Sequence, residues 1–168
     1  MLSHRKAWHY IVKHSANDEV HTLVLESDSV INFPPHEFDA SLLQTFDLFF
    51  WGAWEGHAQL FQSTQKNLDH GFIIGEPFIK SVYCTYGYSL NKKAAALLLK
   101  RTAKICYPVD QFKKFIQQDS LRLGAVKPEM ISSNNIASSI HSRDLNNWQR
   151  RFYLAILDIK NKLICSFR

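Results

Sequence analysis

The chain has 168 residues, 46% of them hydrophobic and 13% aromatic, and it carries a formal net charge of +5 at pH 7. One domain commonly takes about 100 to 200 residues, so we expect residues 1–168 to form a single domain with a sizeable core. The charge is modest, and Lys and Arg do not cluster with base-stacking aromatic residues, which argues against a nucleic-acid partner. An anionic membrane surface suits this charge better.

Signals for helices and strands alternate through the first half of the chain. Ser3 can cap a helix whose apolar residues recur at helical spacing as far as His14. Phe46–Gly52 is strongly apolar and is expected to be a core strand, although Trp51 and Trp54 also suit an acceptor-sugar platform beside a glycine. The elements expected here are helices over 3–14 and 38–44, strands over 22–25, 46–52, 71–75 and 82–89, and a loop over 54–70.

The second half continues the alternation. Asn91 can cap a helix of high intrinsic propensity, and Asp110 stands at the head of another after the helix-stopping Pro108. Strands that alternate with helices predict an α/β fold. The elements expected here are helices over 91–104, from 110 onward and from 146 or 147 to the end, a strand over 121–126 and a loop over 132–135.

The final helix is basic and amphipathic. Its apolar residues form a stripe, and Asp158 is the one acid set against several basic residues. Such a helix can lie on an anionic membrane, or it can dock its stripe on the core and expose a solvated charged face. The stripe residues are Trp148, Phe152, Ala155, Ile156 and Ile159, and the basic residues are Arg150, Arg151, Lys160 and Lys162.

Cysteine and leader signals predict a cytoplasmic protein. Cys84, Cys106 and Cys165 are widely spaced without a CxxC pair, so we expect reduced core residues. The N-terminus has no basic-then-apolar signal, and no run approaches the roughly 18 apolar residues that span a bilayer. We expect a location in the cytoplasm, either free or peripheral on the inner membrane.

Two carboxylates follow the strand over 22–25. Glu26 and Asp28 are spaced one residue apart, directly beyond its carboxyl end, where open α/β sheets bind ligands. Such a pair can hold Mg²⁺ or Mn²⁺ against a substrate diphosphate, which is the acid-x-acid device of nucleotide-sugar transferases. The alternative is a solvated strand end followed by a turn.

Four segments, residues 2–4, 25–28, 83–110 and 127–140, together resemble glycosyltransferase family 25, the lipooligosaccharide and collagen galactosyltransferase group. Residues 2–4 resemble its "LSH" helix and residues 25–28 its "LEDD" strand. Residues 83–110 resemble a block that ends in "PVD", and residues 127–140 its closing segment. The four occur in the family's order, and the resemblance covers most of the chain.

The chain also departs from the family pattern. Ser27 replaces the middle acid of "EDD", and Met1 stands where the family has an interior residue. The resemblance therefore implies a chain that lacks the family's N-terminal βα portion. We expect such a chain to expose an unpaired sheet edge and to be poorly stable or self-associating.

The resemblance implies a fold, a reaction and a site. The fold is α/β, a GT-A-like (Rossmann-like) domain that is N-terminally truncated. The reaction is inverting transfer of a hexose, galactose from UDP-galactose, to a lipooligosaccharide or other glycan. Glu26 and Asp28 would bind the cofactor Mn²⁺ or Mg²⁺ and the nucleotide diphosphate, and Asp110, the acid of "PVD", would be the general base.

Other interpretations remain open. Asp110 is equally suited to be a helix N-cap, worth about 1 kcal/mol. The whole chain could instead be an inactive remnant of the same fold, or a carbohydrate- or membrane-binding module that keeps only the acceptor half.

Overall fold

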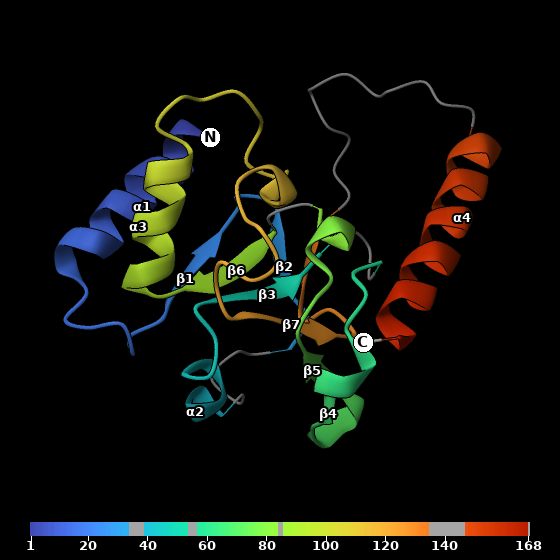
Figure 1. Ribbon diagram of the computed structural model, residues 1–168. Coiled ribbons are helices and arrows are strands. Elements are labelled where there is room, and N and C mark those ends of the chain that lie inside the picture. The colour runs from blue at the N-terminus through green and yellow to red at the C-terminus, as the bar shows by residue number, and fades with distance from the viewer. Residues whose placement is uncertain (34–38, 54–56, 84–85, 135–146, 168) are drawn as a thin grey trace.

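The computed structural model describes residues 1–33, 39–53, 57–83, 86–134 and 147–167 (Figure 1). Helices and a mixed sheet alternate along these residues, so the α/β class expected from the sequence is confirmed. The helices are α1 (Leu2–His14), α2 (Ala40–Leu43), α3 (Lys92–Arg101) and α4 (Asn147–Ser166). Short 3₁₀ turns are η3 (Gln62–Thr64), η4 (Asp69–Gly71), η5 (Ile79–Ser81) and η6 (Phe112–Lys114).

The strands form one large sheet and one small ribbon. The six-stranded sheet has the order β1-β6-β3-β7-β5-β4, and β2 pairs with β8. Among the described strands, β3 and β7 are the one parallel pair, and every other pairing is antiparallel. The bounds are β1 (Thr22–Leu25), β2 (Ser29–Ile31), β3 (Leu48–Gly52), β4 (Lys66–Asn67), β5 (Ile73–Gly75), β6 (Gly87–Leu90), β7 (Leu123–Lys127) and β8 (Ile131–Ser133).

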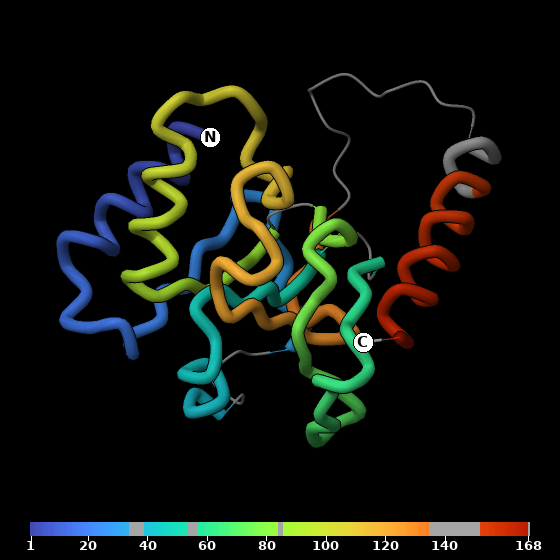
Figure 2. The backbone as a smooth tube through the Cα atoms, viewed as in Figure 1, coloured from blue at the N-terminus to red at the C-terminus, as the bar shows by residue number. Residues whose placement is uncertain are grey.

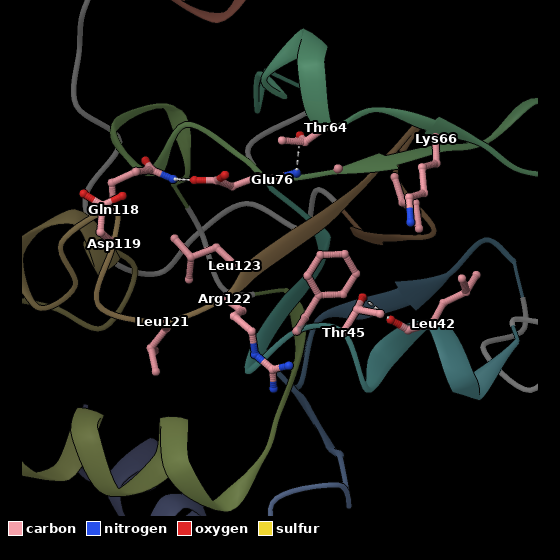
Figure 3. A pocket seen from close by; sticks show the side chains of 13 residues that line it. Leu42, Thr45, Thr64, Lys66, Glu76, Gln118, Asp119, Leu121, Arg122 and Leu123 are labelled. Carbon is pink, nitrogen blue, oxygen red and sulfur yellow. Dashed lines mark hydrogen bonds between the residues drawn. The ribbon is translucent and has the colours of Figure 1, made fainter. Parts of the chain in front are cut away.

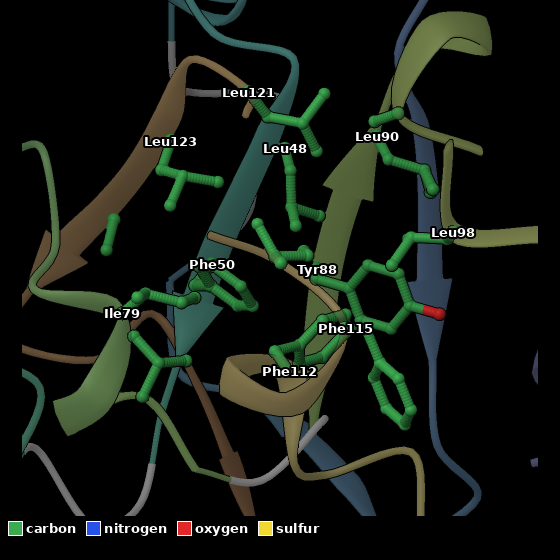
Figure 4. Packing of buried hydrophobic residues seen from close by; sticks show 14 of the residues in the cluster. Leu48, Phe50, Ile79, Tyr88, Leu90, Leu98, Phe112, Phe115, Leu121 and Leu123 are labelled. Atoms are coloured by element: carbon green, nitrogen blue, oxygen red, sulfur yellow. The ribbon is translucent and has the colours of Figure 1, made fainter. Parts of the chain in front are cut away.

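Strand β3 is buried on both faces, which explains its continuous apolar run. Leu48 and Phe50 face the layer covered by α1 and α3, which lie side by side in Figure 1. Figure 4 shows Tyr88 within this layer, with the edge of Phe112 against its ring. Phe49 and Trp51 face the opposite layer, where Met130 and Ile131 pack on them. The sheet thus separates two hydrophobic clusters.

Several expectations need correction. The loop expected over 132–135 is wrong in part, because Ser132 and Ser133 belong to β8. The loop expected over 54–70 contains η3 and β4. The helix expected from Asp110 is only the 3₁₀ turn η6. Ser3 is not the cap of α1, since Met1 takes that position without a side-chain hydrogen bond.

The expectations for the three cysteines and for two of the tryptophans can be compared with the structure. Cys165 is buried as expected, whereas Cys106 is exposed and is not a core residue. Trp51 is only 1% exposed and its indole N–H donates to Ser89 Oγ at 2.6 Å, so it offers no sugar platform. Trp54 and Cys84 lie outside the described residues.

Helix α4 has the expected length. Its apolar stripe, however, faces away from the domain and does not dock on the core. Phe152, Ile156 and Ile159 are each at least half exposed. The domain is contacted by another face, on which Cys165 is buried and Asp158 accepts a hydrogen bond from Gln59. Figures 1 and 2 show α4 beside the sheet, on the side away from α1 and α3. Within the described chain, no helix has the length and apolar character that crossing a membrane requires.

Candidate functional site

The two predicted metal-binding acids lie on the tight turn that joins β1 to β2. The backbone N–H of Glu26 donates to Tyr86 O at 3.1 Å, which extends the pairing of β1 with β6 by one residue. The N–H of Ser29 then donates to Glu26 O at 3.2 Å and closes the turn. Glu26 and Asp28 therefore stand at the carboxyl end of β1, as the sequence predicted.

Asp28 is anchored to the β2–β8 ribbon. Its Oδ2 accepts a hydrogen bond from Ser133 Oγ at 3.1 Å, and its carbonyl oxygen accepts one from Asn134 N at 3.0 Å. These bonds come from a strand more than a hundred residues away along the chain. The position of the Asp28 carboxylate thus depends on correct pairing of β2 with β8.

Glu26 is reached by a chain of hydrogen bonds from the core. His4 Nε2 lies 3.3 Å from Glu26 Oε1, and His4 Nδ1 lies 2.9 Å from the Tyr88 hydroxyl. The indole N–H of Trp8, which can only donate, bonds the same hydroxyl at 2.9 Å. The Tyr88 hydroxyl can therefore donate a hydrogen bond to His4 Nδ1, which leaves His4 Nε2–H to donate one to Glu26.

Burial keeps Tyr88 in its neutral, donating form. Its side chain has no solvent exposure, and this burial raises the pKa of the phenol above its ordinary value. The hydrogen bond from Trp8 works in the opposite direction, and the nearby Glu26 carboxylate raises the pKa further. The chain from Trp8 to Glu26 consequently has one consistent direction of donation.

A cavity of about 450 Å³ opens at these residues. One wall comes from the N-terminal half of α1 and the other from the end of β1 and its turn. The segments that resemble "LSH" and "LEDD" thus meet at one cavity. Its lining residues are Ser3, His4, Ala7, Val24, Leu25, Glu26, Ser27 and Asp28.

The donor set limits the kind of metal that this cavity could hold. Among the described residues, no group of three or more His, Cys, Asp or Glu side chains is arranged to hold a metal ion. A closed, all-protein metal cage is therefore not formed there. Glu26 and Asp28 fit a different mode, in which one or two carboxylates and substrate phosphates share a Mg²⁺ that keeps several waters.

Asp110 lies apart from this cavity's lining. It is exposed and belongs to the turn before η6, whose N-cap is Gln111, without a side-chain capping bond. The helix-cap interpretation of Asp110 is therefore wrong. Phe112, two residues later, packs edge-on against Tyr88 at 5.4 Å between ring centroids, so the "PVD"-like segment is anchored to the residue that also contacts His4.

A second cavity, of about 470 Å³, is lined by residues of α2, β5 and the segment that leads into β7 (Figure 3). Gln118 Nε2 donates to Glu76 Oε1 at 2.6 Å, and Thr64 Oγ1 accepts from the Glu76 N–H at 2.9 Å. Arg122 is bound to the buried Asp47. These polar groups already hold β5, η3 and β7 together, so we favour the cavity at Glu26 as the functional site.

The sequence missed the part played by His4 and Tyr88. Both lie in segments that resembled the family's, but the pattern suggested no link between residues 84 positions apart. No protein-family model matches the chain, and a comparison with curated proteins gave no match. The assignment to glycosyltransferase family 25 accordingly stays a prediction that rests on the four sequence segments.

Proposed function

We propose that the protein is a glycosyltransferase with a GT-A-like fold. In this proposal it transfers a hexose, galactose from UDP-galactose, to a lipooligosaccharide or similar glycan. The observation that carries the proposal is the cavity where Ser3 and His4 of α1 face Glu26 and Asp28 of the β1–β2 turn. Two separate family-like segments contribute to this one cavity, and the acids stand directly beyond the carboxyl end of β1.

Each wall of the cavity would have a defined task. Glu26 and Asp28 would hold Mn²⁺ or Mg²⁺ with the donor diphosphate, and the ion would offset the negative charge that develops on the leaving nucleotide. His4 would orient the carboxylate of Glu26, because the histidine is itself held in place by its hydrogen bond with Tyr88. Ser133 does the same for Asp28.

The acceptor hydroxyl must lose its proton during transfer. Asp110 is the proposed general base, since it is exposed and a carboxylate can accept that proton. Its anchor is Phe112, which sits against Tyr88. For direct transfer, the attacking acceptor hydroxyl must lie against the anomeric carbon of the donor and within hydrogen-bond reach of the Asp110 carboxylate.

Calorimetry of UDP binding tests the proposal. We expect UDP to bind with Mn²⁺ present and to bind at least tenfold more weakly in EDTA. Asp28→Ala should remove this difference, while Ser27→Ala should keep it because a hydroxyl is a weaker ligand for a hard cation. Asp18→Ala, which removes an exposed carboxylate elsewhere, is the matched control. Equal UDP affinity with and without Mn²⁺ in the parent protein would rule out the metal role.

A transfer assay separates an enzyme from a binding module. UDP-galactose, Mn²⁺ and an oligosaccharide acceptor should give a product heavier by one hexose, detected by mass spectrometry. UDP binding without any such product would favour the inactive remnant or binding module of the same fold.

A further inference from the structure

An exposed apolar stripe runs along α4. Phe152, Ile156, Ile159 and Leu163 follow one another at spacings of four, three and four residues, which places them on one side of the helix. Each is at least half exposed, and Phe167 beyond the helix is 88% exposed. From Phe152 to Leu163 the stripe extends about 17 Å at 1.5 Å per residue.

The described part of the domain does not cover this stripe. Helix α4 is attached through its opposite face, where Asp158 Oδ1 accepts from Gln59 Nε2 at 2.7 Å and lies 3.6 Å from His57 Nδ1. Cys165 is buried on the same face. A surface helix normally turns its apolar stripe to the core, so an outward stripe of this size indicates a contact surface.

A positively charged groove borders the stripe. It has a volume of about 430 Å³ and lies between α4 and the η5 and η6 turns. Four lysines line it: Lys80, Lys113, Lys114 and Lys160. The described lining contains no Asp or Glu. Lys113 is placed over the ring of Tyr83, with its Nζ 3.9 Å from the ring centroid, and Lys114 over that of Tyr107 at 5.1 Å.

Lys160 joins the two features. It follows Ile159 of the stripe directly in sequence and also lines the groove. An apolar stripe beside a cluster of lysines matches a bilayer interface, where acyl chains lie next to anionic phosphates. A second copy of the chain fits less well, because a symmetric contact over this edge would bring two like-charged lysine clusters together.

We propose that α4 and the lysine groove together form a docking surface for membranes that contain anionic lipids. The stripe enters the interface in the plane of the membrane, and the four lysines contact lipid phosphates. This inference does not depend on the transferase activity, because it uses neither Glu26, Asp28 nor Asp110.

Flotation with lipid vesicles tests the proposal. Vesicles of phosphatidylcholine with 30% phosphatidylglycerol should bind the protein at least tenfold more tightly than pure phosphatidylcholine, and high salt should reverse most of the gain. Ile156→Ser with Ile159→Ser should lower the affinity at least tenfold. Val20→Ser with Ile105→Ser, which removes two exposed apolar side chains elsewhere, should leave it unchanged.

Two lysine variants test the groove separately. Lys80→Gln and Lys160→Gln should each weaken binding to the anionic vesicles about fivefold without affecting the neutral ones. Circular dichroism and melting curves would show that every variant is folded. Three outcomes would overturn the proposal: equal binding to both vesicle types, equal losses in the stripe and control variants, or a stable dimer in sedimentation that Ile156→Ser with Ile159→Ser dissociates.

Discussion

Asp47 offers the sharpest test of the fold that positions the site. Its carboxylate has no solvent exposure and accepts hydrogen bonds from three side chains. Arg122 Nη2 donates at 2.7 Å, Lys93 Nζ at 2.9 Å and Asn91 Nδ2 at 3.1 Å. Asn91 also caps α3, because its Oδ1 accepts a hydrogen bond from the backbone N–H of Ala94. Asp47 therefore ties β3 and β7 to the helix on which α1 packs.

The change Asp47→Asn removes the charge but keeps the shape. It also replaces one acceptor oxygen with an NH₂ group that faces donors from Arg122 or Lys93. Breaking a buried ion pair costs about 3–5 kcal/mol. Because the side chains of Lys93 and Arg122 are half exposed and can be solvated, we expect a loss of about 3 kcal/mol, a large part of the 5–15 kcal/mol typical of a whole domain.

The pH dependence identifies the cause. Burial by itself would raise the pKa of the Asp47 carboxyl, but the hydrogen bonds from Arg122, Lys93 and Asn91 outweigh it and hold the pKa well below its usual value. This stabilisation is therefore complete above the unfolded pKa of about 3.9 and is lost as the pH falls through the folded pKa. The difference between parent and variant should be constant from pH 7 to pH 5 and narrow below about pH 4.

Urea unfolding at several pH values, followed by the fluorescence of the buried Trp8 and Trp51, measures that difference. Asp18→Asn, an exposed acid, should change the free energy of unfolding by no more than about 0.5 kcal/mol. A cost of Asp47→Asn below 1 kcal/mol, or a difference that narrows between pH 7 and pH 5, would refute the account of Asp47.

Three further predictions concern the site and the sheet edge. Asp110→Asn should keep the melting temperature and UDP affinity and lower transfer at least about 10²-fold if Asp110 is the base; unchanged transfer would remove that role. Tyr88→Phe should cost about 1–3 kcal/mol in urea unfolding, because the buried Trp8 N–H loses its acceptor; a silent change would contradict the hydrogen-bond chain. Among the described strands, β1 pairs only with β6, and it exposes Leu23 and Leu25, so the parent protein should self-associate in light scattering. Leu23→Lys with Leu25→Lys should reduce this self-association, and a monodisperse parent protein would refute the prediction.

Local sequence signals predicted the elements whose stabilising features lie within their own residues. Helix α3 was predicted from its cap and its alanine-rich sequence, and Asn91 does accept a hydrogen bond from Ala94 N. Strand β3 was predicted from a run of apolar residues that is buried throughout. Strand β8 was missed because Ser132 and Ser133 have low strand preference, and the strand forms by pairing with β2, some hundred residues earlier.

In the candidate site, too, some residues could be predicted from local sequence and others could not. The acids Glu26 and Asp28 could be predicted, because a strand signal directly precedes them. Their supports could not: His4 meets Glu26 only after α1 packs on the sheet, and Ser133 meets Asp28 only after β8 forms. Strand β1 was predicted, but its place at the edge of the sheet and the exposure of Leu23 and Leu25 were not. Edge or centre is a property of the sheet order, which no local pattern contains.

Helix α4 shows a different limit of sequence reasoning. The period of its apolar residues correctly predicted a stripe, but a period does not state which face meets the domain. A stripe of apolar side chains should dock inward unless another face makes contacts that the stripe cannot make. Asp158 supplies that alternative: its carboxylate bonds Gln59 and Lys162 and lies near His57. A rotation of the helix that turned the stripe inward would take Asp158 away from Gln59 and His57, so the polar contact and the exposed stripe are two consequences of one orientation.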